Sequence, residues 1–249
     1  MKEVTIIAGA TGGLGKAVAK EAAKRGHNLV LIAKDIRKLE NLNSEILQKT
    51  RDVEILCYVV DIGKITEEEI KKIFSEIYSK LGRIDYLINC IGIGGWWQIE
   101  EISLKIWNDI ITINATGAFL LSKYASICMK KQNKGIIINV SSIAGKKGAQ
   151  YSSAYCASKF SIVGFSYALA EELNKYGIKV IVVILGGIDT EFVRKAISNS
   201  SPILTKYIQQ NYLHRNDSMK TQQVAKVILS LIDLPKDVSI NEIVIKRTY

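Results

Sequence analysis

The sequence predicts an α/β fold built on one doubly wound sheet of parallel strands, with helices on both faces. Short apolar segments alternate with segments of helical periodicity along the 249 residues. Nearly every position of the short segments is apolar, which is typical of parallel strands buried on both faces. Right-handed crossovers through the helices would join such strands. Because no linker, charge block or internal repeat interrupts the pattern, we expect a single domain over residues 1–249.

Seven segments are predicted as strands because they are short, rich in Val, Ile and Leu, and bounded by turn residues or helices. They cover residues 3–9, 29–33, 54–60, 86–91, 135–140, 179–185 and 242–246. Segments in which apolar residues recur every three or four positions are predicted as helices. These cover residues 14–25, 36–49, 67–80, 104–130, 154–175 and 222–234. Gly26 after the first helix and Thr66 before the third are residue types that cap helix ends.

Composition and charge exclude several classes of protein. The formal net charge is +10, but the basic residues are scattered and form no stripe with interleaved aromatics, so we expect no nucleic-acid partner. Two histidines, and four cysteines without a C-x-x-C spacing, predict no metal site and reduced thiols. No apolar run approaches the roughly 20 residues that cross a bilayer, and the N-terminus lacks the features of a signal peptide. We therefore expect a cytoplasmic protein without a membrane partner.

A glycine-rich turn joins the first predicted strand to the first helix. Its sequence is AGATGGLG (residues 8–15), with glycines at positions 9, 13 and 15. Glycines at this point let the backbone turn tightly and approach a diphosphate, and the following helix N-terminus favours negative charge. No Gly-Lys-Ser/Thr follows, so the turn is not a P-loop. The turn predicts a Rossmann-like dinucleotide site.

The end of the second strand bears on which dinucleotide is bound. A carboxylate there would bind the ribose 2′-hydroxyl of NAD, whereas a cation would accept the 2′-phosphate of NADP. In this chain Ala33 occupies the usual acidic position and Lys34 follows it, with Arg37 and Lys38 nearby. Asp35 is the counter-argument, and Lys34 as a merely solvated strand end is the alternative. The sequence favours NADP(H) over NAD(H).

A tyrosine, a lysine and a serine lie close together around the fifth strand and the helix that follows it. Tyr155 and Lys159 are four residues apart on a predicted helix, which places them on one face. A neighbouring ammonium would favour the phenolate and lower the Tyr155 pKa, so the phenol could exchange a proton with an alkoxide. Ser142 ends the fifth strand, where parallel strands face a ligand crevice, and its hydroxyl could hold a substrate oxygen. An ordinary surface pair is the alternative for Tyr155 and Lys159 alone.

Together these features resemble the short-chain dehydrogenase/reductase family over nearly the whole chain. The family's T-G-x-x-x-G-x-G pattern corresponds to residues 8–15, and its N-N-A-G pattern to NCIG at 89–92. Its active-site Asn, Ser, Tyr and Lys correspond to Asn114, Ser142, Tyr155 and Lys159. Its adenine-binding Asp corresponds to Asp61, followed by Ile62, and its Pro-Gly motif to LGGIDT at 185–190.

The resemblance implies a reductase mechanism and a set of binding residues. Hydride would pass from NADPH to a carbonyl, with Tyr155 as proton donor, Lys159 lowering its pKa and holding the ribose, Ser142 orienting the oxygen, and Asn114 completing a proton relay. The implied cofactor-binding residues are Gly9, Thr11, Gly13, Leu14, Gly15, Lys34, Asp61, Ile62, Asn89, Gly92, Tyr155, Lys159, Gly186, Ile188 and Thr190. The family further implies a homodimer or homotetramer packed through the helices at 104–130 and 154–175.

A small-molecule carbonyl or alcohol is the expected substrate, and 3-oxoacyl thioesters are one class that the resemblance suggests. Residues 188–220 are polar and irregular, and we expect them to form a lid over the substrate. Besides Ser142, the residues expected to contact substrate are Trp96 and Tyr207, and Tyr212 and His214 lie on the same lid segment.

Four positions depart from the family pattern. Ala8, Cys90, Ile91 and Leu185 replace its usual Thr, Asn, Ala and Pro, and none of them is a catalytic position. An NAD-linked alcohol dehydrogenase and a non-catalytic cofactor-binding regulator are therefore the alternatives to an NADP-dependent reductase.

Overall fold

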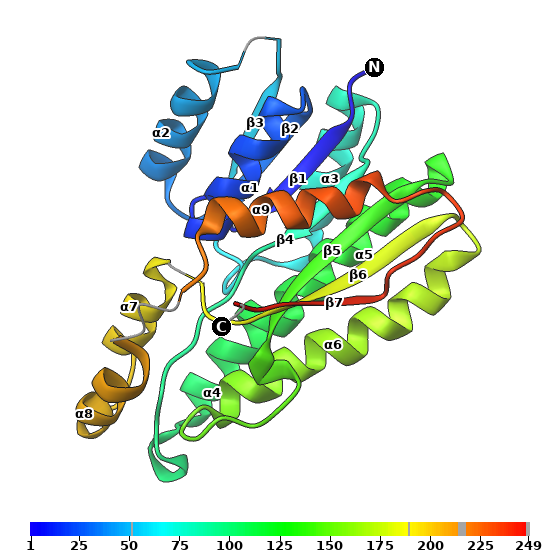
Figure 1. The fold of residues 1–249 in the computed structure, drawn as a ribbon. Coiled ribbons are helices and arrows are strands. Elements are labelled where there is room, and N and C mark those ends of the chain that lie inside the picture. Colours follow the sequence, from blue (N-terminus) through cyan, green and yellow to red (C-terminus); the bar gives the residue numbers. More distant parts are fainter. Residues whose placement is uncertain (51, 189, 214–217, 248–249) are drawn as a thin grey trace.

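A sheet of seven parallel strands forms the centre of the molecule (Figure 1). The structure is a computed structural model that describes residues 1–50, 52–188, 190–213 and 218–247. The strands lie in the order β3-β2-β1-β4-β5-β6-β7. Their bounds are β1 Val4–Ala8, β2 Asn28–Ala33, β3 Ile55–Val59, β4 Tyr86–Asn89, β5 Gly135–Ser142, β6 Ile178–Leu185 and β7 Glu242–Ile245. The predicted doubly wound parallel sheet is confirmed, and each predicted strand lies within two residues of an observed one.

Helices cover both faces of the sheet and enclose two apolar cores. Alternate residues of a strand point to opposite faces, so Ile7 packs beneath α1, α2 and α9, whereas Ile6 packs beneath α3, α5 and α6. The bounds are α1 Gly13–Lys24, α2 Ile36–Leu47, α3 Glu67–Leu81, α4 Leu104–Ile111, α5 Gly117–Gln132, α6 Ser153–Asn174, α7 Glu191–Ser198, α8 Thr205–Ile208 and α9 Thr221–Ser230. The predicted cap at Thr66 is confirmed, since its hydroxyl accepts from the Glu69 N–H.

The single helix predicted over residues 104–130 is interrupted. A turn of π-helix, Thr112–Thr116, separates α4 from α5 and carries the buried Asn114. π-Helical turns of this kind occur mainly at functional sites. By length and apolar composition alone the stretch Leu104–Gln132 could cross a membrane, but 56% of its most apolar window is buried inside the fold, as in the core helix of a globular protein.

The strand order places a ligand crevice at the carboxyl edge of the sheet. The chain starts at β1, winds to β3 on one side, and then crosses to β4 on the other side of β1. Ligands of open α/β sheets bind where the order reverses in this way. Register brings Ala8 beside Asn89, and Asn89 beside Asn139, at this edge. The segments that follow β1, β4 and β5 therefore meet there.

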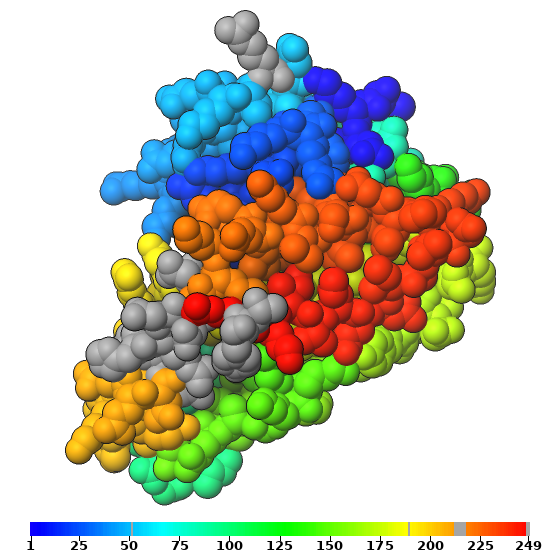
Figure 2. Space-filling view, viewed as in Figure 1, coloured from blue at the N-terminus to red at the C-terminus, as the bar shows by residue number. Residues whose placement is uncertain are grey.

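The expected lid is mostly helical. Residues 190–213 contain α7, α8 and short turns, and α8 belongs to a lobe that projects from one end of the molecule (Figure 2). Apolar side chains of α7 and α8 cluster with Trp96 from the loop after β4. Position 189 and residues 214–217, which include His214, lie outside the described part of the chain. The segment thus packs against the same edge as the crevice.

Candidate active site

The glycine turn forms a close-fitting backbone cradle at the end of β1. Gly9 has a φ of +77°, and a Cβ there would lie 3.1 Å from the backbone of Cys90. A Cβ at Gly15 would collide with the carbonyl oxygen of Gly9. Gly12 precedes α1 without a side-chain cap, so the first N–H groups of the helix have no side-chain acceptor from that position. This is the arrangement that binds phosphate at a helix N-terminus.

Lys34 and Asp35 differ in what their side chains do at the end of β2. Lys34 is exposed, whereas the carboxylate of Asp35 accepts a hydrogen bond of 3.1 Å from the N–H of Lys38 and caps α2. Asp35, the carboxylate that favoured NAD, therefore already serves as the N-cap of α2. The exposed cations that surround it are Lys34, Arg37 and Lys38.

Asp61 and Ile62 follow β3 at the same edge. The Asp61 carboxylate is exposed and accepts from the Gly63 N–H at 3.1 Å. Ile62 is buried against α5, where a Cβ on Gly117 would lie 2.6 Å from its Cγ2. Asn89, at the end of β4, is buried and accepts from the Ile91 N–H at 3.2 Å.

The structure brings Ser142, Tyr155 and Lys159 together. Tyr155 and Lys159 lie one turn apart on α6, with the Lys159 Nζ 5.8 Å from the centre of the phenol ring. The Ser142 hydroxyl accepts from the Ala144 N–H at 3.1 Å, and it lies close enough to the Tyr155 side chain to lower the pKa of the phenol. Lys159 is only 4% exposed and donates to the carbonyl oxygen of Val140 at 3.1 Å. These groups therefore lie together where the end of β5 meets α6.

Burial, rather than charge, decides the pKa values of this pair. It raises the pKa of Tyr155 to about 12, against a smaller lowering by the nearby Ser142 hydroxyl. It also lowers the pKa of Lys159 to about 8, against a smaller raising by Cys90. The expected lowering of the Tyr155 pKa is therefore wrong for this structure. Desolvation penalises both the phenolate and the ammonium, and it is the largest cause of both shifts.

Two residues that the sequence did not single out within the loop after β4 and the expected lid pack against Tyr155. A Cβ on Gly94 would lie 3.0 Å from the Tyr155 Cδ2, and the Phe192 ring lies 5.8 Å from the Tyr155 ring. Gly92 stands beside the lysine in the same way, since a Cβ there would lie 3.3 Å from the Lys159 Nζ. The closely spaced glycines of residues 92–95 were the sequence feature that could have indicated this contact. Only a residue without a side chain fits so near Tyr155 and Lys159.

Cys90, a departure from the family pattern, lies beside Lys159 in the site. Its thiol is electrostatically coupled to Lys159, and burial raises the pKa of this thiol to about 12. It is therefore a neutral neighbour of the lysine at physiological pH. Within the described residues, no three His, Cys, Asp or Glu side chains lie together as a metal site would require.

Thr190, the last residue of the LGGIDT motif, lies directly against the glycine turn. Thr190 caps α7 by accepting from the Phe192 N–H at 3.2 Å, and a Cβ on Gly13 would lie 2.9 Å from the Thr190 Cγ2. The Gly186 N–H donates to the Ile245 carbonyl at 2.9 Å, and Ile188 forms a parallel bridge with Met219. Two other expected cofactor residues lie in the turn itself, Thr11 half-buried and Leu14 in the core.

Trp96 and Tyr207 lie in the apolar cluster beneath the lid. Trp96 is buried among side chains that include Ala196, Leu204 and Ile208, and Tyr207 packs against the same cluster. The backbone N–H of Trp96 donates to the Ser200 hydroxyl at 2.8 Å, and this bond links the loop to the residues that follow α7. Trp96 thus holds the lid to the loop after β4.

Trp97 packs in the opposite direction from Trp96. It is buried against Ile110 of α4 and Ala154 of α6. On the Trp96 side, the ring of Tyr151 stands edge-on to Tyr207 at 4.9 Å. The two adjacent tryptophans therefore join the loop to different parts of the molecule.

Comparisons with known proteins agree on one family. The family model described as short chain dehydrogenase matches residues 3–201. The chain is 31% identical over 229 residues to a 3-oxoacyl-[acyl-carrier-protein] reductase of Aquifex aeolicus, covering 92% of this chain and 89% of that protein. The solved structure of levodione reductase matches with a TM-score of 0.86 at 25% identity, covering 98% of this chain and 96% of that one. ElxO with NADP bound matches with a TM-score of 0.80 at 29% identity over 98% of each chain.

Proposed function

Because the chain belongs to the short-chain dehydrogenase family, we propose that it interconverts a small-molecule carbonyl compound and its alcohol with NADP(H) as cofactor. Proteins that it resembles are named reductases, and the chain is an NAD(P)-dependent oxidoreductase. The observation that carries the proposal is that Ser142, Tyr155 and the buried Lys159 lie together, with the Lys159 Nζ 5.8 Å from the centre of the phenol ring.

The residues present fit a dinucleotide. A side chain at Gly9 or Gly15 would fill the cradle, and the start of α1 directs N–H groups toward it. We assign the diphosphate to this turn, the adenine to Asp61 and Ile62, and the nicotinamide end to the segment around Thr190. When bound, NADPH supplies the hydride. Preference for NADP over NAD rests on exposed Lys34, since the competing Asp35 caps α2.

The protein's own groups would handle the proton. With a pKa raised to about 12, Tyr155 is protonated at neutral pH and can donate its hydroxyl proton to the oxygen of a carbonyl undergoing reduction. The Ser142 hydroxyl, already in contact with Tyr155, would hold that oxygen in place. The ammonium of Lys159 would stabilise the phenolate that remains after transfer.

The surroundings favour an enclosed reaction and an oligomer. The lid of residues 190–213, with Trp96 and Tyr207, would form the apolar wall that excludes water. Large apolar side chains are exposed on α4, α5 and α6, and we assign this face to a homodimer or homotetramer contact. These side chains are Leu104, Trp107, Phe119, Ile127, Phe160 and Tyr167. All four cysteines are free, as in a cytoplasmic protein.

The test is cofactor oxidation by the purified protein, with NADPH or NADH, against ketones, aldehydes and 3-oxoacyl thioesters. We expect NADPH-dependent turnover that falls by about 10²–10⁴ in Tyr155→Phe while NADPH binding is kept. Binding without turnover across the panel, unchanged in Tyr155→Phe, would instead favour a cofactor-binding regulator. Alcohol oxidation that prefers NAD would favour the NAD-linked dehydrogenase.

A further inference from the structure

Ser158 is a buried serine between the two site residues of α6, and both of its hydrogen-bonding roles are taken. It is 0% exposed, its hydroxyl donates to the Tyr155 carbonyl oxygen at 2.7 Å, and it accepts from the Asn114 Nδ2 at 2.9 Å. A hydroxyl has one hydrogen, and a carbonyl can only accept. The hydroxyl oxygen must therefore face Asn114 as an acceptor.

Asn114 passes this constraint to the loop after β4. Its Nδ2 also donates to the carbonyl oxygen of Ile93 at 2.9 Å, and its Oδ1 accepts from the Ile93 N–H at 2.8 Å. The amide is 1% exposed and is held at three points. Without the Ser158 hydroxyl, one Nδ2 hydrogen would lose its acceptor away from water, which is costly for a buried donor.

Ile93 stands between the two glycines that touch the site. Gly92 lies beside the Lys159 ammonium and Gly94 against the Tyr155 ring. The path from Ser158 through Asn114 to Ile93 therefore fixes how close this loop lies to the two side chains. The path starts at Ser158 on α6, the helix that also carries Tyr155 and Lys159. Helix α6 therefore helps to position the loop that covers its own two site residues.

We infer that Ser158 is a positioning residue that holds the loop of residues 92–95 against Tyr155 and Lys159 through the Asn114 amide. The inference rests on the proposed function, because the reaction would take place under this loop. The Ser158 hydroxyl bonds the backbone carbonyl of Tyr155 and the amide of Asn114, not the phenol or the Lys159 ammonium, so it acts on those two groups through Asn114 and the loop. Rate should depend on Ser158 more than cofactor binding does, because most residues assigned to the cofactor, such as Gly13, Asp61 and Thr190, lie outside the loop of residues 92–95.

A second buried serine of α6 provides the matched control. Ser166 is 1% exposed and accepts from the Asn139 Nδ2 at 3.1 Å, so Ser166→Ala also removes the acceptor of a buried asparagine amide. Asn139 belongs to β5 and has no bond to the loop. Ser158→Ala and Ser166→Ala should therefore lower the thermal unfolding midpoint to a similar degree and differ in activity.

The experiment combines turnover with hydrogen exchange. We expect Ser158→Ala to lower kcat by about tenfold with the KM for NADPH within about twofold, because a small misplacement of a reacting group is costly. Exchange of the peptide covering residues 92–98 should be faster in Ser158→Ala alone. Ser158→Thr keeps the hydroxyl and should behave like wild type in both measurements.

Equal kcat and equal exchange in the two alanine variants would overturn the inference. Hydrogen exchange also separates this failure from a failure of the proposed function. If the wild type shows no turnover, the proposed function fails, while faster exchange of residues 92–98 in Ser158→Ala alone would still support positioning by Ser158.

Discussion

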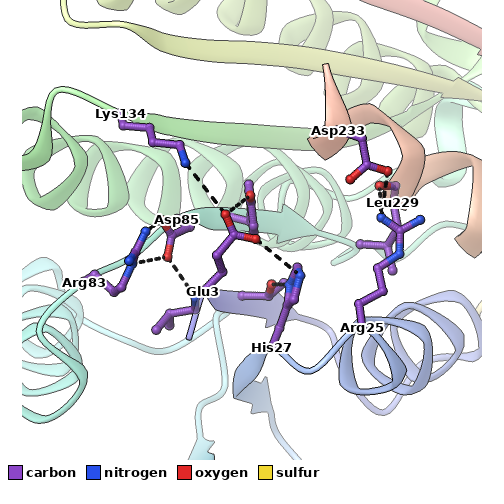
Figure 3. Close-up of polar contacts among 11 residues, drawn as sticks. Glu3, Arg25, His27, Arg83, Asp85, Lys134, Leu229 and Asp233 are labelled. Atoms are coloured by element: carbon purple, nitrogen blue, oxygen red, sulfur yellow. Dashed lines mark hydrogen bonds and ion pairs between the residues drawn. The ribbon is translucent and has the colours of Figure 1, made fainter. Parts of the chain in front are cut away.

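Two buried charges, one at each edge of the same sheet, differ in the partners that surround them. At the amino edge Asp85 is 1% exposed, accepts from the Val4 N–H at 2.9 Å, and binds Arg83 through two hydrogen bonds of 2.7 and 2.5 Å (Figure 3). At the carboxyl edge Lys159 is almost as deeply buried. Within the described residues its hydrogen bond goes to the Val140 carbonyl, and no carboxylate lies within ion-pair distance.

The rest of the amino edge repeats the pattern of paired charges. Glu3 accepts from the Tyr86 hydroxyl at 2.7 Å and faces His27 at 3.5 Å and Lys134 at 3.7 Å (Figure 3). These hydrogen bonds and ion pairs link the start of β1 to the start of β4. The unpaired ammonium of Lys159, by contrast, is costly to bury and useful beside a phenol that gives up a proton. One edge of the sheet is arranged for stability and the other for chemistry.

The largest expected effect comes from removing the unpaired charge. Lys159→Met should lower turnover by at least about 100-fold, because the phenolate formed from Tyr155 loses its neighbouring cation. The free energy of unfolding should stay the same or rise, since an apolar side chain replaces a buried ion. Turnover assays and urea denaturation check both parts. A large loss in the free energy of unfolding would contradict the claim that the buried charge of Lys159, unlike that of Asp85, does not stabilise the fold.

Removing the paired charge should have the opposite result. Asp85→Ala leaves Arg83 and the Val4 N–H without their partner, and we expect a loss of about 3–5 kcal/mol in the free energy of unfolding. Turnover per folded molecule should not change. Urea denaturation measures the loss, with Asp233→Ala as control, because Asp233 pairs with Arg25 at 2.9 Å but is 64% exposed. The control should lose much less.

Cofactor preference comes next in size. Lys34→Glu should raise the KM for NADPH about 10- to 100-fold, the effect of losing one charge-assisted hydrogen bond to a phosphate. The KM for NADH should change little or fall. Lys80→Glu, at an exposed helix end far from the crevice, serves as the charge-matched control. Equal affinities of the wild type for the two cofactors would remove the argument from Lys34.

The smallest effect concerns acid and the amino edge. Burial lowers the pKa of His27 below 6.5, against smaller opposing effects of Glu3 and other carboxylates. The unfolded chain therefore binds a proton at a higher pH than the folded one, and the contribution of neutral His27 is lost as pH falls below 6.5. Thermal unfolding between pH 7.5 and 5.5 should show this decline, and His27→Gln should flatten it. An unchanged slope in the variant would assign the decline to other groups.

Features of the site that depend on local sequence were open to prediction. The pairing of Tyr155 with Lys159 follows from helical spacing, and the cradle at Gly9 follows from the turn between β1 and α1. The π-helical turn at Thr112–Thr116 could not be predicted in this way, because periodicity does not distinguish it from α-helix. It is held by bonds from Asn114 to residues 21 and 44 positions away in the sequence.

The sequence by itself determined the parallel sheet, the order of its elements along the chain and the glycine turn, because these depend on periodicity and residue type within short segments. Only the tertiary structure decided how deeply Tyr155 and Lys159 are buried. Gly94, from the loop after β4, and Phe192, from α7, cover Tyr155, and Gly92 lies beside the Lys159 ammonium. Desolvation depends on that distant cover, so it alone fixed the direction of the Tyr155 pKa shift.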